Sequence, residues 1–283
     1  MASGVLFDAP GPKTVARHRI YTIVAVVVLL ALVAYAVKRL YDAGQFEYAL
    51  WEPFVTPNIM RAIGEAWLDT ITMAVLAVLG ALVFGLVFGV GKLSDRKPVR
   101  WVSWLVVEFF RAVPVIMLMI FSFYAIFNSM SIEDGAYWSV VLSLTVYNGA
   151  VLAEVFRAGV NAVPRGQAEA AYAIGMRKSQ VMNVILLPQA VKIMIPAIIS
   201  QMVVALKDTS LILIVFGVGL TKILKSLPLS FNNIVPTTIV ISALYVITNL
   251  ALTYLATRAQ RRFVGEKEML QVSNVAEPVS NVA

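Results

Sequence analysis

The segment Thr70–Gly91 reads TITMAVLAVLGALVFGLVFGVG, which is 22 consecutive residues without a charged side chain. A helix of about 20 mainly apolar residues crosses the hydrocarbon core of a bilayer. The 283-residue chain as a whole has the same bias, since 60% of its residues are hydrophobic and only 14% are charged, against about 25% charged in soluble domains. The sequence therefore predicts an all-α membrane protein and excludes a disordered chain, a collagen and a basic nucleic-acid-binding protein.

Further charge-poor segments bring the number of expected transmembrane helices to six. They are Ile20–Val37, Ala112–Ile132, Gly135–Ala153, Ser179–Leu206, which contains only Lys192 as a charge, and Ser226–Thr257, of which Pro236–Thr257 is expected to cross. The apolar segment Thr209–Leu220 is too short to span, so we expect a short or re-entrant helix on the outer side. Pro114, Pro188 and Pro196 each remove a helix hydrogen bond, and kinks are expected there.

Lysine and arginine are distributed unevenly between the two sides of the membrane. With the N-terminus inside, the inner segments carry 15 of these residues and the outer segments 6. Cytoplasmic segments of membrane proteins are enriched in them. The sequence thus predicts a multi-pass protein with both termini in the cytoplasm. It would have a polar tail at 1–19, a transmembrane domain at 20–263 and a disordered tail at 264–283.

Small residues recur at every fourth position of the second span, at Ala77, Ala81, Gly85 and Gly89. Residues four apart share one helix face, and a face of small side chains lets another helix approach closely. We therefore predict a close helix contact here, either within the subunit or across a dimer.

Charged residues at membrane depth usually face a partner or a cavity. Glu108 and Arg111 lie three residues apart, close enough to pair on one helix face, and Glu154 and Arg157 repeat this spacing. Each pair has two interpretations, an anchor for its helix or part of a polar path across the membrane. The candidates for such a path are Arg111, Tyr147, Asn148, Glu154, Gln201, Lys207 and Asp208.

Catalytic and metal-binding residue types are scarce. The chain has no cysteine and one histidine, His18, which leaves no thiol nucleophile and no histidine cluster for a metal ion. Glu65 and Asp69 share a helix face, but they fall at the outer interface, where carboxylates are readily solvated. We therefore expect no catalytic residue, no metal site and no bound cofactor in this chain.

The segment 163–190 reads VPRGQAEAAYAIGMRKSQVMNVILLPQA and lies between the fourth and fifth spans, on the inner side. Pro164 suits the first position of a helix, and the alanine-rich run Gln167–Ile174 favours helix. Gly175 permits a sharp turn, after which Arg177–Val184 is expected to start a second helix. The segment 163–184 thus predicts a helix–turn–helix at the membrane surface that presents a rigid knob to the cytoplasm.

This loop resembles the EAA loop of ABC importer permeases. The matching positions are Glu169-Ala170-Ala171, then Gly175 after three residues, Ile185 after nine more, and Leu187-Pro188. The resemblance implies the type I permease fold, in which the loop is a coupling helix that docks into a cytoplasmic ATPase. The coupling residues that it implies are Arg165, Gln167, Glu169, Ala170, Ala171, Gly175 and Arg177.

Three more motifs resemble the polar amino acid uptake branch of these permeases. They are NGAVLAEVFRAGVNAVPRGQ at 148–167, LKDTSL at 206–211, and FRAVP at 110–114, where Ala112 and Val113 replace the branch's Gly and Thr. Overall similarity leans toward glutamate uptake permeases of actinobacteria. The resemblance implies a bacterial cell-membrane subunit that binds no cofactor itself and works with an ATPase dimer carrying ATP and Mg²⁺. A second permease subunit, expected to be a different chain, and an extracellular substrate-binding protein would complete the importer.

Three alternatives remain open at this stage. A secondary transporter driven by an ion gradient would explain the intramembrane charges, but it predicts internal repeats with broken helices, and no convincing repeat is present. A membrane enzyme would need catalytic groups that the chain lacks. The surface loop alone would also suit a basic helix resting on anionic lipid, although such a helix needs neither Glu169 nor Gly175.

Overall fold

The computed structural model describes residues 12–214 and 216–264, and every regular element in these ranges is a helix. The elements are α1 (Pro12–Asp42), α2 (Tyr48–Trp51), η1 (Glu52–Val55), α3 (Pro57–Lys92), α4 (Lys97–Ala112), α5 (Val115–Ala125), α6 (Ile132–Asn161), α7 (Arg165–Ala173), α8 (Lys178–Gln180), η2 (Val181–Leu186), α9 (Leu187–Asp208), η3 (Thr209–Ile214), α10 (Leu220–Phe231) and α11 (Ile234–Val264). Within the described residues, five helices are long and apolar enough to cross a membrane, or six if the bent pair α4–α5 forms one span.

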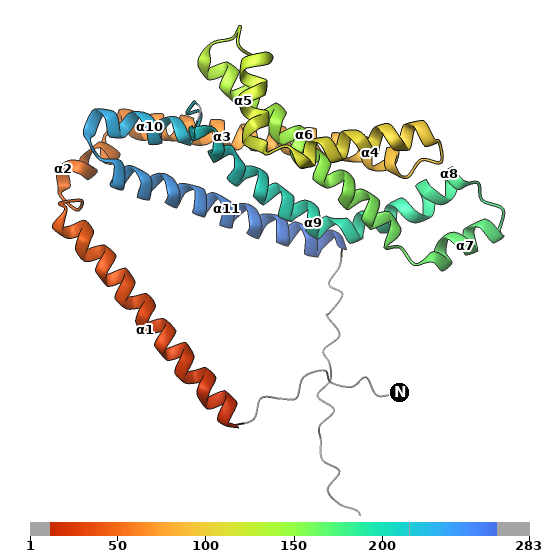
Figure 1. Ribbon diagram of the computed structural model, residues 1–283, viewed down its shortest axis with the longest axis horizontal. Helices are drawn as coiled ribbons and strands as arrows, with labels where there is room; N and C mark the ends of the chain where they lie inside the picture. Colours follow the sequence, from red (N-terminus) through yellow and green to blue (C-terminus); the bar gives the residue numbers. More distant parts are fainter. Residues whose placement is uncertain (1–11, 215, 265–283) are drawn as a thin grey trace, which may run out of the picture.

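The central contact of the bundle is between α3 and α6, which run alongside each other (Figure 1). A Cβ added to Gly85 would lie 2.7 Å from the Leu152 side chain, and one added to Gly89 would lie 3.0 Å from the Ala153 carbonyl oxygen. Both glycines are therefore needed for the close approach. The predicted small-residue contact is confirmed, and its partner is a helix of the same subunit.

The third expected span, Ala112–Ile132, is wrong as a single helix. The helix α4 ends at Ala112, α5 begins at Val115, and the two axes meet at 100°. Pro114 causes this break because the residue before a proline is pushed out of the helical region, and Val113 is extended, with φ −81° and ψ 128°. Consequently α5 projects from the bundle (Figure 1).

The sixth expected span matches α11, since its crossing part, Pro236–Thr257, lies within that helix. The longer charge-poor segment from Ser226 is divided, because Ser226 belongs to α10 and α11 begins at Ile234. Asn232, with φ 52°, ends α10 in the left-handed conformation, which asparagine tolerates better than most residues. The segment Thr209–Leu220 was expected to form a short or re-entrant helix. Its first part forms the short 3₁₀ helix η3.

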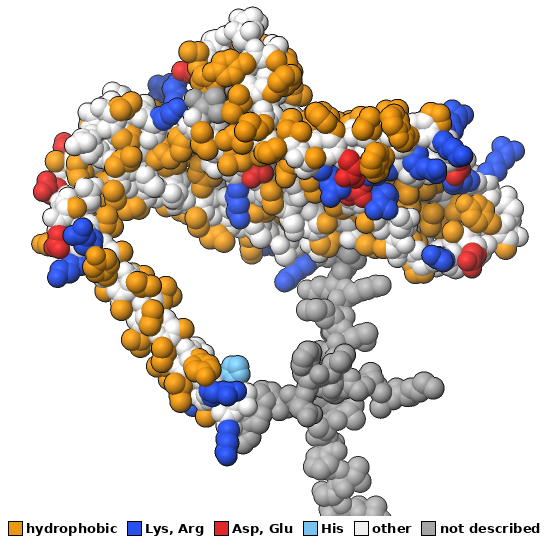
Figure 2. Space-filling view, viewed as in Figure 1, with side chains coloured by type: hydrophobic (Ala, Val, Ile, Leu, Met, Phe, Trp, Pro, Cys, Tyr) orange, Lys and Arg blue, Asp and Glu red, His pale blue; other side chains and the backbone are white. Residues whose placement is uncertain are grey.

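The first helix stands apart from the others. It begins at Pro12 rather than after residue 19, so the predicted tail is too long, and its apolar window is 0% buried. In Figure 2, hydrophobic side chains cover the length of α1, and basic side chains lie near both of its ends. A helix that is apolar on every side and exposed along its apolar stretch suits contact with lipid. The remaining tail expectations, for 1–11 and 265–283, lie outside the described residues.

Candidate functional site

The loop between α6 and α9 folds into a helix, a tight turn and a second helix, as predicted. The helix α7 starts at Arg165, one residue later than expected, with Pro164 as its N-cap. At its end the Gly175 amide donates to the Tyr172 carbonyl at 2.9 Å, and the Met176 amide donates to the Ala171 carbonyl at 3.1 Å. These two bonds form a Schellman motif. Gly175 has φ +84°, so glycine is required there by backbone conformation.

The buried side of α7 holds it against the protein. Ala171 is only 4% exposed, and α7 packs against η2, which leads directly into α9. The Gln189 amide on α9 donates to Gln167 Oε1 at 3.4 Å. The helix–turn–helix is therefore attached to the fifth span, α9, as well as to the fourth span, α6.

The opposite side of α7 is open and chemically mixed. Glu169 is exposed and forms no salt bridge with any described residue. Two large apolar side chains lie beside it, Tyr172 at 47% exposure and Ile174 at 79%. Neither was selected from the sequence, where they look like ordinary members of a helical run. An exposed carboxylate flanked by exposed apolar groups on a rigid helix is suited to a protein partner.

The other coupling candidates divide between surface and scaffold. Arg165, Gln167 and Ala170 are exposed on α7. The Arg177 backbone amide donates to Gln180 Oε1 at 2.8 Å, which caps α8. Next to it Lys178 forms an ion pair with Asp95 in the α3–α4 loop, so the knob also contacts the end of α3.

Replacing Gly175 with valine is expected to reduce transport strongly, because a β-branched residue is strained at φ +84°. No atom lies within 4 Å of the Cβ position, so the effect would come from backbone strain of about 1–3 kcal/mol. Gly166→Ala is the matched control, since Gly166 lies in α7, also with open space, where alanine favours helix. Equal uptake by both variants in membrane vesicles would contradict the role given to this turn.

A polar contact links α6 and α9 within the membrane. Asn148 is 1% exposed, and its amide donates to the Leu144 carbonyl at 3.0 Å. The Gln201 amide donates to Asn148 Oδ1. Tyr147, one residue earlier on α6, is half-buried. Two of the path candidates are thus brought together, on the two helices that emerge from the coupling loop.

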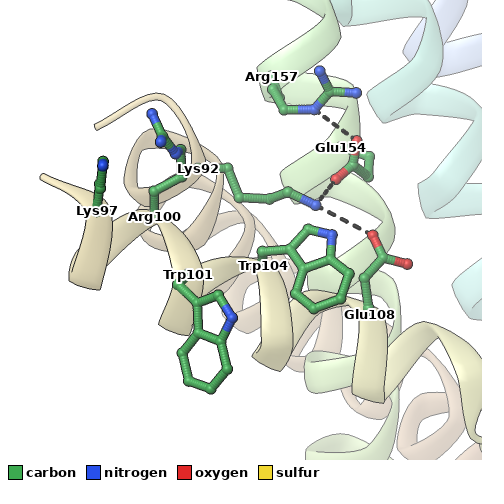
Figure 3. Close-up of a pocket in the computed structure, with 8 residues that line it drawn as sticks. All are labelled: Lys92, Lys97, Arg100, Trp101, Trp104, Glu108, Glu154 and Arg157. Atoms are coloured by element: carbon green, nitrogen blue, oxygen red, sulfur yellow. Dashed lines mark hydrogen bonds and ion pairs between the residues drawn. The ribbon is translucent and has the colours of Figure 1, made fainter. Parts of the chain in front are cut away.

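A second polar cluster joins the C-terminal parts of α3, α4 and α6 (Figure 3). Lys92, whose side chain is 7% exposed, forms ion pairs with Glu154 and with Glu108, the latter at 3.3 Å. Arg157 Nε lies 2.9 Å from Glu154, and Arg111 Nη1 lies 3.4 Å from Glu108. Both pairs expected from the spacing are confirmed. Lys92 at their centre was not expected, since sequence analysis counted it only as a loop cation.

The last two path candidates, Lys207 and Asp208, belong to neither group. Lys207 lines a cavity of about 530 Å³ between α9, α10 and α11, together with Tyr245 and Asn249. Asn249 Oδ1 is buried and has no hydrogen-bond partner among the described residues. Asp208 is half-buried at the end of α9. The seven candidates therefore occupy three regions rather than one continuous path.

No group of three or more His, Cys, Asp or Glu side chains able to hold a metal ion occurs among the residues the structure describes.

Comparison with known proteins places these features in one family. The pattern of the family described as "Binding-protein-dependent transport system inner membrane component" matches residues 81–265. The glutamate transport system permease protein GluD of Corynebacterium glutamicum is 38% identical over 226 residues, which cover 77% of this chain and 81% of that protein. The glutamate/aspartate import permease protein GltK of Escherichia coli O157:H7 is 33% identical over 151 residues, or 50% of this chain and 67% of that protein.

Solved structures give the same result for the fold. A chain of an amino acid ABC transporter crystallised with histidines superimposes with a TM-score of 0.66 at 26% identity, covering 72% of this chain and 95% of that one. A chain of the MetNI methionine ABC transporter, in an inward-facing conformation, superimposes with a TM-score of 0.60. At 21% identity and with coverage of 74% of this chain and 98% of that one, the second similarity shows the fold alone.

Proposed function

This chain belongs to the binding-protein-dependent transport system inner membrane components and is a permease subunit of an amino acid ABC importer, and we propose that its substrate is glutamate. The proposal is supported by the 38% identity to a permease named for glutamate transport, over most of both chains. As a permease subunit it has a transport role rather than an enzymatic one.

The partners belong to the same proposal. A dimer of cytoplasmic ABC ATPases would bind ATP and Mg²⁺ and hold α7, while this chain binds no cofactor. A second permease subunit, of different sequence, would enclose the path, and an extracellular binding protein would deliver the substrate. Both termini would then be cytoplasmic, in line with the 15-to-6 distribution of Lys and Arg.

The observation that carries the coupling mechanism is the position of α7. It lies between α6 and α9, and these are the two helices joined by the Asn148–Gln201 hydrogen bond. A force applied to a rigid α7 would therefore move α6 and α9 relative to each other at the point where their polar side chains meet. Closure of the ATPase dimer would thereby change the side of the membrane to which the path opens, through a rigid-body transition.

Substitution of Gln201 tests whether glutamate passes this contact. Gln201→Leu and Gln201→Glu both remove the amide donor that bonds Asn148, but only the second adds a negative charge. Two like charges about 4 Å apart repel by about 4 kcal/mol in a partly screened site. We expect glutamate uptake to fall at least about tenfold further for Gln201→Glu than for Gln201→Leu. Equal uptake by the two variants, at equal amounts in the membrane, would place the substrate elsewhere.

The substrate itself is tested by uptake of radiolabelled glutamate into cells that contain or lack this permease. The expected result is uptake that depends on the permease and is reduced by unlabelled glutamate more than by arginine or methionine. Stronger inhibition by another amino acid would show that this amino acid, rather than glutamate, is the substrate. The family assignment would be unaffected.

A further inference from the structure

The first half of α4 forms one wall of a pocket of about 590 Å³. Lys97, Arg100, Trp101 and Trp104 line this pocket (Figure 3), and their spacing of three and four residues places them along one side of the helix. The ion cluster centred on Lys92 lines one end of the pocket. The pocket therefore has one end at which the charges are paired and another end that is open.

The cations at the open end of the pocket lack the acidic partners that the cations at the other end have. Lys92 and Arg157 are paired with carboxylates, whereas Lys97 and Arg100 are exposed and pair with no acidic side chain in the described ranges. Both lie in the first turn of α4, where the helix dipole disfavours cations and favours anions. Two unpaired positive charges at this place form a favourable environment for a phosphate group.

The aromatic and apolar side chains of α4 indicate what carries that phosphate. Trp101 is 61% exposed, and exposed tryptophans of membrane proteins concentrate at the level of the lipid head groups. Val102, Leu105 and Phe109 are also exposed, on α4 itself. A free phosphate ion would use only the cations, whereas a phospholipid would use the cations, the tryptophans and the apolar side chains together.

We propose that this pocket binds the head group of an anionic phospholipid of the cytoplasmic leaflet, with its phosphate between Lys97 and Arg100 and its glycerol region against Trp101 and Trp104. The lipid would hold the start of α4 beside α3 and α6. Basic pockets between transmembrane helices on the cytoplasmic side bind anionic head groups in the same way.

The test uses the full-length chain in lipid vesicles that contain a small fraction of brominated phosphatidylglycerol or brominated phosphatidylcholine. Bromine quenches nearby tryptophan, and two of the chain's five tryptophans line the pocket. We expect phosphatidylglycerol to quench at a lower lipid fraction than phosphatidylcholine. The Lys97→Gln/Arg100→Gln double variant should lose this preference, on the order of fivefold for each cation at low salt.

Two further variants keep the result interpretable. Lys38→Gln/Arg39→Gln removes two adjacent cations from the last turns of α1, neither of which lines this pocket, and it should keep the full preference. Lys97→Arg/Arg100→Lys preserves both charges and should keep it as well. If glycerol 1-phosphate in solution abolished the preference, the site would bind free phosphate rather than lipid. Equal quenching by both lipids, or a preference that survives in the double glutamine variant, would overturn the proposal.

Discussion

Replacing Glu169 with alanine is expected to abolish ATP-driven uptake while the chain remains folded in the membrane. Glu169 is exposed on α7 and pairs with no described residue of its own chain, so its removal costs the isolated subunit little. Against a partner, loss of one member of a desolvated charge pair costs about 2–5 kcal/mol. That corresponds to binding of the ATPase weakened by at least about 30-fold.

Uptake of labelled glutamate and the amount of ATPase that co-purifies are measured together for this variant. Glu65→Ala is the matched control, because Glu65 is also an exposed carboxylate but lies in the N-terminal part of α3, where it forms an ion pair with Arg61. Ile174→Ala should act like Glu169→Ala, since Ile174 caps the C-terminal end of α7 with its side chain 79% exposed. Normal uptake by the Glu169 and Ile174 variants would exclude α7 as the coupling element.

Replacing Lys92 with methionine is expected to destabilise the subunit more than removal of any surface cation. Its ammonium group is almost fully buried and lies between Glu108 and Glu154. Its loss would leave Glu108 with Arg111 and Glu154 with Arg157 as remaining partners, so we expect a cost below the about 3–5 kcal/mol of a buried charge left without any partner. Arg61→Ala breaks a pair whose side chains are 83% and 63% exposed, and such pairs contribute at most about 1 kcal/mol.

Thermal unfolding of the detergent-solubilised variants measures this difference. The double variant Lys92→Met/Glu154→Gln should recover part of the loss, because it also removes a carboxylate that Lys92→Met leaves with Arg157 as its remaining partner, and residues in one network are not additive. An unfolding temperature for Lys92→Met that equals that of Arg61→Ala would show that the cluster contributes no more than a surface pair.

The features that sequence reasoning predicted well are those set by local pattern. The small residues from Ala77 to Gly89 specified a close helix contact because periodicity alone fixes which face they share. The turn at Gly175 followed from the conformational freedom of glycine after a helix-favouring run. Pairing of Glu108 with Arg111 and of Glu154 with Arg157 followed from a spacing of three residues on a helix.

The features that sequence reasoning missed depend on contacts between distant segments. Lys92 closes the interior cluster with a residue 62 positions away, and nothing near it in the sequence marks that role. The 100° bend at Pro114 exceeds the kink expected there. Exposure of Tyr172 and Ile174 was equally invisible, because an apolar residue on a helix normally faces the protein.

The central claim is that α7 docks directly against an ABC ATPase, and site-specific cross-linking tests it most directly. The chain contains no cysteine, so Ile174→Cys introduces a unique thiol on the exposed face of α7. Leu229→Cys, at 88% exposure on α10, provides an equally accessible thiol at the opposite end of the bundle. After treatment of native membranes with a short thiol-to-thiol or thiol-to-amine cross-linker, the adducts are identified by mass spectrometry. We expect the Ile174→Cys variant to cross-link to an ATP-binding-cassette subunit and the Leu229→Cys variant not to do so. An ATPase adduct from the Leu229→Cys variant, or none from the Ile174→Cys variant in membranes that retain ATP-driven uptake, would contradict the account.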